Sequence, residues 1–108
     1  MVRRIDMTLA GLESISEYRF RLTGGLTLSS VAELNQLFYA QVPVIDGVSI
    51  ELDAVRRVDS AGLVLLLSWM RLFKTQGIAI RFLDPSAQMR SIAELSDLDS
   101  ILFSDTGS

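Results

Sequence analysis

An alternation of strand-like and helix-like segments is the feature that most constrains how this chain can fold. Apolar and polar residues alternate with the period of a half-buried strand at Tyr18–Leu22 and Val48–Leu52, and Ile78–Leu83 gives a third strand. Thr23-Gly24-Gly25 is expected to end the first of them. Because strands that alternate with helices of ten or more residues form βαβ units, the pattern predicts an α/β fold with a partly parallel sheet covered by helices.

Three helices are predicted between and after these strands. The first follows Ser30, which can serve as its N-cap, and Pro43 closes it. The second runs from about Ser60 to Gln76, where Gly77 is well placed to end it. The third begins after Asp84-Pro85-Ser86 and carries apolar residues at helical spacing.

The two ends of the chain give further expectations. Ile5–Leu9 is predicted as a strand and Gly11–Ser16 as the polar turn that follows it. Ile101–Phe103 is predicted as a last short strand, and Ser104–Ser108 as a frayed tail. No linker, repeat or low-complexity stretch divides the chain, so all 108 residues are expected to form one domain.

Composition argues against several classes of function. The sequence has no cysteine and no histidine, which removes thiol nucleophiles, Cys-ligated metals and the commonest general base near neutral pH. Ser60 therefore has no histidine to activate it, and the carboxylates lack metal-ligand spacing. A net charge of −3 gives no support for nucleic-acid binding. We predict a protein that is not an enzyme and holds no cofactor or metal.

No segment has the character of a signal peptide or a membrane span. The N-terminal residues lack a continuous apolar region, and the longest apolar run, Ala61–Leu67, is far shorter than the ~20 residues that cross a bilayer. We therefore expect an unexported protein.

The helix predicted at Ser60–Gln76 is apolar on more than one side. Its core-facing stripe consists of Leu63, Leu66, Leu67, Met70 and Phe73. The other side and its flank mix Ser68, Arg71 and Thr75 with Ala61, Val64, Leu65, Leu72 and Trp69. Two interpretations stay open: further protein such as the C-terminal helix covers this side, or its apolar residues form an exposed patch that meets another protein.

A polar pair, Asp59 and Ser60, begins this helix. Asp59 is a good N-cap because its carboxylate can accept from amides of the first turn, and this role alone explains an aspartate. Ser60 could share the capping, or it could present its hydroxyl where the amides of Gly62 and its neighbours accommodate an added phosphate. The small residues Ala61 and Gly62 would let a partner or a kinase approach closely.

The run Val58-Asp59-Ser60-Ala61-Gly62-Leu63 resembles the Asp-Ser-x-Gly-Leu signature of STAS domains, the family of anti-sigma-factor antagonists and sulphate transporters. Leu22-x-Gly24-x-Leu26-Thr27 is similar to the family's earlier Leu-x-Gly-x-Leu turn, and Ile50-x-Leu52-Asp53 to its central strand. The resemblance covers nearly the whole chain. It implies a single STAS-like α/β domain, with a mixed parallel and antiparallel sheet, helices packed mainly on one side, and a binding role without catalysis.

Within this family, the segment from Arg57 to Gly77 is most similar to MlaB-like proteins, the cytoplasmic STAS subunits of a bacterial ABC transporter that moves phospholipids between two membranes. That resemblance implies a transporter ATPase as partner, a cytoplasmic location, and contact with the membrane only through a complex. It also implies a docking surface at the start and outer face of the helix, made of Asp59, Ser60, Ala61, Gly62, Val64, Leu65 and Ser68.

The alternative is an anti-sigma-factor antagonist, a partner-switching regulator. In that branch an anti-sigma factor with serine kinase activity phosphorylates the serine after the aspartate, which corresponds to Ser60. MlaB-like proteins commonly have threonine at this position, so Ser60 keeps the alternative open. Ala61 stands where antagonists usually have Ser or Thr, which argues the other way.

Overall fold

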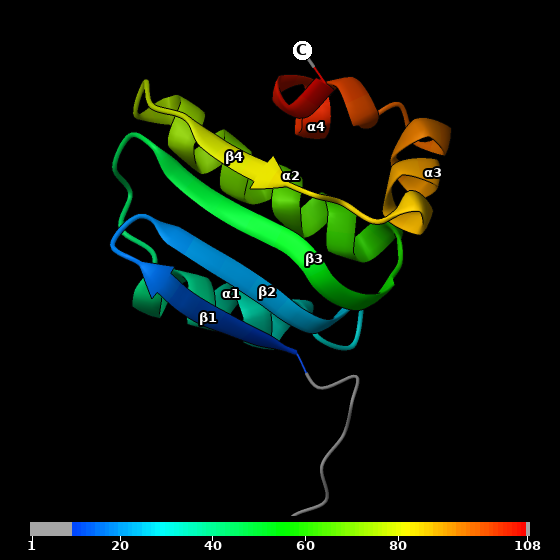
Figure 1. Cartoon of the computed structure of the whole chain (residues 1–108), viewed down its shortest axis with the longest axis horizontal. Coiled ribbons are helices and arrows are strands. Elements are labelled where there is room, and N and C mark those ends of the chain that lie inside the picture. Colours follow the sequence, from blue (N-terminus) through cyan, green and yellow to red (C-terminus); the bar gives the residue numbers. More distant parts are fainter. Residues whose placement is uncertain (1–9, 108) are drawn as a thin grey trace, which may run out of the picture.

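Four strands form one sheet in the order β1-β2-β3-β4 (Figure 1). The computed structural model describes residues 10–107, with side chains described as far as Phe103. β1 pairs antiparallel with β2, whereas the β2–β3 and β3–β4 pairs are parallel, so the sheet is mixed. The strands are β1 (Gly11–Ser16), β2 (Arg19–Leu26), β3 (Val48–Val58) and β4 (Ile80–Leu83).

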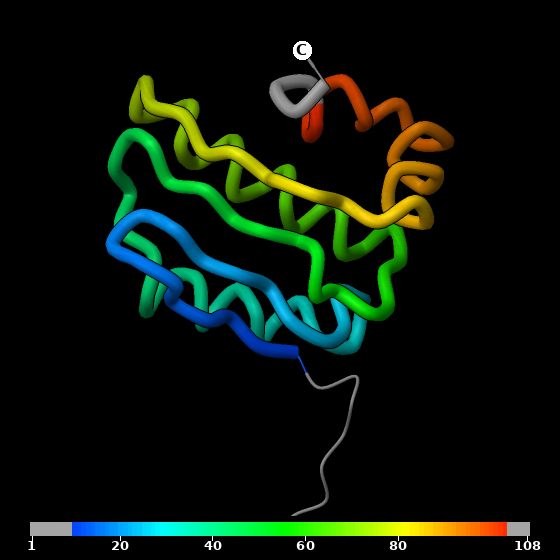
Figure 2. Tube along the Cα trace, viewed as in Figure 1, coloured from blue at the N-terminus to red at the C-terminus, as the bar shows by residue number. Residues whose placement is uncertain are grey.

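Helices cover one face of this sheet and one of its edges. They are α1 (Val31–Gln41), α2 (Ser60–Thr75), α3 (Ala87–Leu95) and α4 (Asp99–Gly107). α1 and α2 pack on each other behind the sheet, while α4 packs along β4 (Figure 1). The chain trace in Figure 2 passes from β4 through α3 to α4 beyond the β4 edge and leaves the front face of the sheet open. The predicted fold, one α/β domain with helices mainly on one side, is confirmed.

The core lies between the sheet and the two helices behind it. The strand register aligns Phe20, Ile50 and Phe82 in one row across β2, β3 and β4. All three side chains are at most 3% exposed. Because side chains alternate between the two faces of a strand, the residues beside them face the open side, as the period-two pattern predicted.

Two segments predicted as turns are strands instead. Gly11–Ser16 forms β1, since an edge strand with one wet face needs few apolar residues, and Leu12 supplies one to the core. Gly24 and Gly25 do not end β2, because two register shifts let the strand continue beside β3 to Leu26. The strand predicted at Ile5–Leu9 lies outside the described residues.

The last predicted strand, Ile101–Phe103, is also wrong, because these residues are helical. The amide of Leu102 donates to the carbonyl of Leu98 at 2.8 Å, and Leu102 and Phe103 are buried where α4 packs along β4. A run of three apolar residues has no period of its own, so only the packing decides its conformation. α4 extends to Gly107 and thus includes most of the segment expected as a tail.

Candidate docking site at the start of α2

The start of α2 lies at the carboxyl ends of the two long parallel strands. β2 ends at Leu26 and β3 at Val58, and these two residues are neighbours in the sheet. The amide of Asp59 donates to the carbonyl of Leu26 at 3.2 Å, so the sheet pairing continues into the residue that begins the helix. Loops that leave the carboxyl ends of parallel strands gather at one edge, which is where such folds commonly carry their sites.

Asp59 holds two segments together. Its Oδ1 accepts from the amide of Gly62 at 3.2 Å, which confirms the predicted N-cap. Its Oδ2 accepts from the amide of Leu28 at 3.1 Å, in the loop that leads from β2 to α1. The second bond was not predicted, because its donor is a backbone group that no sequence pattern marks.

Gly62 is required by packing rather than by access for a partner. A Cβ atom placed on this residue would lie 2.1 Å from the carbonyl oxygen of Leu26, so no side chain fits there. The residue is buried beneath the end of β2. Gly62 therefore lets α2 approach the sheet closely, and its own atoms are not part of the outer surface.

Three of the predicted site residues form an exposed line on α2. Ser60, Val64 and Ser68 are all exposed and follow one another at intervals of four residues, which places them on one side of the helix. Val64 is 57% exposed, a large value for an apolar side chain. The Ser60 hydroxyl has no hydrogen-bond partner among the described residues, whereas Ser68 donates to the carbonyl of Leu65 at 2.7 Å. Ala61 is half-buried beside this line.

The prediction of a wider apolar patch is wrong for Leu65 and Trp69. Trp69 is fully buried: its ring stacks on Phe38 of α1 with centroids 4.1 Å apart, and its Nε1 donates to Oδ1 of Asn35 at 2.9 Å. Leu65, one helical turn earlier on the same side, is 8% exposed. The layer that covers this side of α2 is therefore α1 rather than the C-terminal helix, and the open apolar surface is centred on Val64.

An open hollow of about 530 Å³ lies beside Asp59. Its lining includes Thr27, Ser29 and Arg57, and is thus rich in polar groups. Ser30 lines it too. This residue stands at the N-cap position of α1, as predicted, but its side chain does not cap the helix: its hydroxyl donates to the carbonyl of Gly25 at 2.8 Å and accepts from the amide of Thr27 at 3.0 Å. These bonds shape the loop next to the start of α2.

A family model described as "Mlab, STAS domain" matches residues 13–103, and this span includes Asp59, Ser60 and the whole of α2. The chain belongs to the MlaB-type STAS family. STAS domains are in general not catalytic. Within the part of this STAS domain that the structure describes, no helix is long and apolar enough to cross a bilayer.

Solved structures show that the fold is shared more widely. The anti-sigma factor antagonist SpoIIAA in its unphosphorylated form is 20% identical, with a TM-score of 0.61 over 88% of this chain and 86% of that one. The phosphorylated form of the Bacillus cell fate determinant SpoIIAA gives 20% identity and a TM-score of 0.58 over 88% and 89% of the two chains. A search of curated protein sequences finds no significant match. At this level of identity the structures show a common fold.

Proposed function

We propose that this STAS domain is a non-catalytic subunit that binds and regulates the cytoplasmic ATPase of an ABC transporter for phospholipids. The match of residues 13–103 to the MlaB-type family model carries the proposal. The resemblance of the segment around Asp59 and Gly62 to MlaB-like proteins supports the choice of partner. In such a complex the domain would meet the membrane only through the transporter.

The geometry at the start of α2 suits a docking surface. Asp59 and Gly62 hold the first turn of the helix against the sheet and the neighbouring loop, so a partner would meet a surface that is already ordered. Burial of an exposed side chain such as Val64 contributes about 1.5–3 kcal/mol before the costs of association. The line of Ser60, Val64 and Ser68 would thus supply an apolar centre with polar flanks.

The test is affinity purification of tagged protein from its native cell, with three variants on one face of α2. Ser60→Asp and Val64→Asp place a charge in the proposed interface. Thr75→Asp, the matched control, places a charge at the other end of the helix, about 22 Å from Ser60 and about 16 Å from Val64 along its axis. We expect an ABC ATPase to be recovered with wild type and Thr75→Asp, and lost with the other two. Equal recovery with all four folded proteins, or recovery of no ATPase with wild type, would refute the proposal.

A second candidate is the partner-switching antagonist, which one observation favours. The Ser60 hydroxyl is exposed at the first position of α2 and has no partner among the described residues, so a serine kinase could reach it. A phosphate there would face the positive end of the helix dipole. The intact mass of the affinity-purified protein distinguishes this candidate from the transporter subunit. A phosphorylated fraction whose phosphate maps to Ser60, together with recovery of a serine kinase, supports the partner-switching antagonist.

A further inference from the structure

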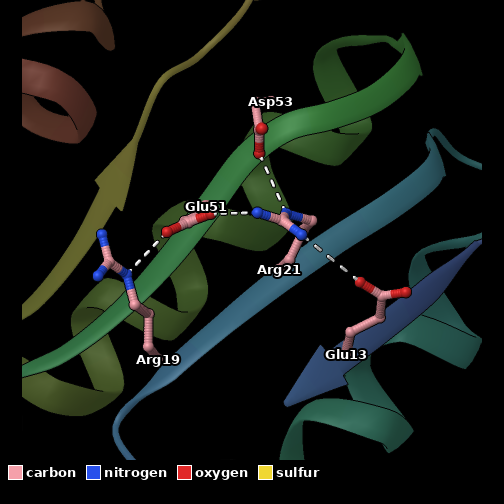
Figure 3. Close-up of polar contacts among 5 residues, drawn as sticks. All are labelled: Glu13, Arg19, Arg21, Glu51 and Asp53. Carbon is pink, nitrogen blue, oxygen red and sulfur yellow. Dashed lines mark hydrogen bonds and ion pairs between the residues drawn. The ribbon is translucent and has the colours of Figure 1, made fainter. Parts of the chain in front are cut away.

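The open face of the sheet carries a network of charges centred on Glu51 of β3. Figure 3 shows two arginines from β2 on either side of this carboxylate: Oε2 lies 2.7 Å from Nε of Arg19, and Oε1 lies 2.8 Å from Nη2 of Arg21. Arg21 also reaches Asp53 at 3.3 Å and Glu13 at 4.0 Å. The pKa of the Arg21 guanidinium is raised, chiefly by its hydrogen bond to Glu51. Among the described residues, Arg21 thus has three acidic partners, whereas Arg19 has one, Glu51, which it shares with Arg21.

The strand register brings a third arginine to the same face. Arg19 of β2 is the neighbour of Ser49 of β3, which is in turn the neighbour of Arg81 of β4. Strands are spaced about 4.8 Å apart, so the two arginine Cα atoms lie roughly 10 Å apart, with Ser49 between them. Arg81 is exposed and, among the described residues, has no ion-pair partner.

The two arginines line one hollow in the surface. Its volume is about 600 Å³, and Ser49, Gly47 and Glu17 also border it. In Figure 3 the Arg19 side chain extends from β2 across β3 with its two terminal nitrogens directed toward β4, away from Glu51. Since the ion pair with Glu51 is made through Nε of Arg19, the two terminal nitrogens are left to face the hollow, which Arg81 also borders.

We propose that this hollow binds the phosphate group of a small molecule or of a lipid headgroup, held between Arg19 and Arg81 and near the Ser49 hydroxyl. Each guanidinium presents parallel donors that match the oxygens of a phosphate. A phosphate has enough oxygens to meet two guanidiniums and a hydroxyl together, whereas a carboxylate has only two. Glu17 on the rim opposes an anion, so we expect millimolar rather than micromolar affinity.

This site is separate from the docking surface on α2. The hollow lies near Arg19, where β2 begins, and Gly47, which directly precedes β3, whereas α2 starts at the opposite, carboxyl ends of those strands. The inference therefore does not depend on which partner binds at Ser60. It would give the domain a second recognition site, on the face of the sheet that none of the described helices covers.

The test is a titration of the full chain with inorganic phosphate, followed by ¹H–¹⁵N correlation spectra at constant ionic strength. We expect saturable shifts of the amide signals of Arg19, Ser49 and Arg81. Arg81→Gln should weaken binding at least about tenfold. Arg90→Gln, which removes an exposed arginine of α3, is the matched control and should bind like wild type.

Two results would overturn the proposal: shifts that grow without saturation, or an Arg81→Gln protein that binds phosphate as well as wild type.

Cosedimentation with vesicles then identifies the source of the phosphate. Binding to phosphatidylglycerol vesicles that Arg81→Gln abolishes assigns it to a lipid headgroup. No sedimentation, with the phosphate titration intact, assigns it to a soluble molecule. Glu17→Gln should tighten binding in either case, since it removes the opposing charge.

Discussion

The backbone amide of Leu28 donates a hydrogen bond to Oδ2 of Asp59 at 3.1 Å, across 31 positions of sequence. The other oxygen of the same carboxylate accepts from the amide of Gly62 and caps α2. One side chain therefore joins the loop before α1 to the start of α2. The residue that marks the family signature thus has a structural role that is independent of any partner.

Removal of the Asp59 carboxylate should destabilise the domain by about 2–3 kcal/mol, since Asp59→Ala loses a helix cap and a bond from a second amide to a charged oxygen. Asp59→Asn keeps only one acceptor oxygen and should lose about half as much. Ser60→Ala is the control, because the exposed Ser60 hydroxyl has no partner among the described residues. Urea unfolding measures all three; a loss with Ser60→Ala equal to that with Asp59→Ala would contradict this account.

Two glycine-to-alanine changes should differ greatly in cost. In Gly62→Ala the new methyl group would meet the Leu26 carbonyl at 2.1 Å, and the backbone must shift, so we expect a loss of about 3 kcal/mol or more. Gly77 has a φ of +70° but nothing within 4 Å of its Cβ position, so Gly77→Ala should cost only about 1 kcal/mol. Thermal unfolding of the two variants gives the comparison, and equal midpoints would show that the close approach at Gly62 is absent.

The sequence predicted the type of most elements because burial on one side imposes a period. The strands predicted at Tyr18 and Val48 and the helix predicted at Ser60 carry that period and were found, although the two strands continue beyond their predicted ends to Leu26 and Val58. The strand from Gly11 to Ser16 was missed because its residues are mostly polar and its pairing with β2 supplies the order. Pairing of this kind is made by backbone hydrogen bonds, so it does not require a recognisable pattern of apolar and polar side chains.

The candidate site was predicted only in part, for a similar reason. Capping by Asp59 follows from local chemistry and needs no knowledge of the rest of the fold. Whether Leu65 and Trp69 are buried depends on where α1 packs. The contact between α1 and α2 joins residues more than 30 positions apart in the sequence. Asn35 and Phe38, three residues apart on α1, were the available signal, because together they offer an amide acceptor and an aromatic face to a tryptophan.

The contact between α1 and α2 should make Trp69 essential for stability. Trp69→Ala should cost about 3–5 kcal/mol, as for other large core residues. Trp69→Phe keeps much of the ring packing but leaves Oδ1 of Asn35 without its donor, at a cost of about 1 kcal/mol. Because the chain has one tryptophan, its fluorescence reports this contact directly, and the folded protein should emit at shorter wavelength than the unfolded chain. A near-neutral Trp69→Ala would place the side chain on the surface.

The charge of Glu51 should matter more than that of its exposed neighbours. Its side chain is 11% exposed, accepts a hydrogen bond from Arg21 and forms an ion pair with Arg19. Glu51→Gln removes the charge from both contacts and should cost about 1–2 kcal/mol. Glu13→Gln is the matched control, because Glu13 is 59% exposed and lies 4.0 Å from Arg21. Urea midpoints should fall for Glu51→Gln and stay unchanged for Glu13→Gln. Added salt should reduce the difference in urea midpoint between Glu51→Gln and wild type, since it screens the charges of the partly exposed arginines. A difference in midpoint that does not change with salt would mean that packing, not charge, makes Glu51 important.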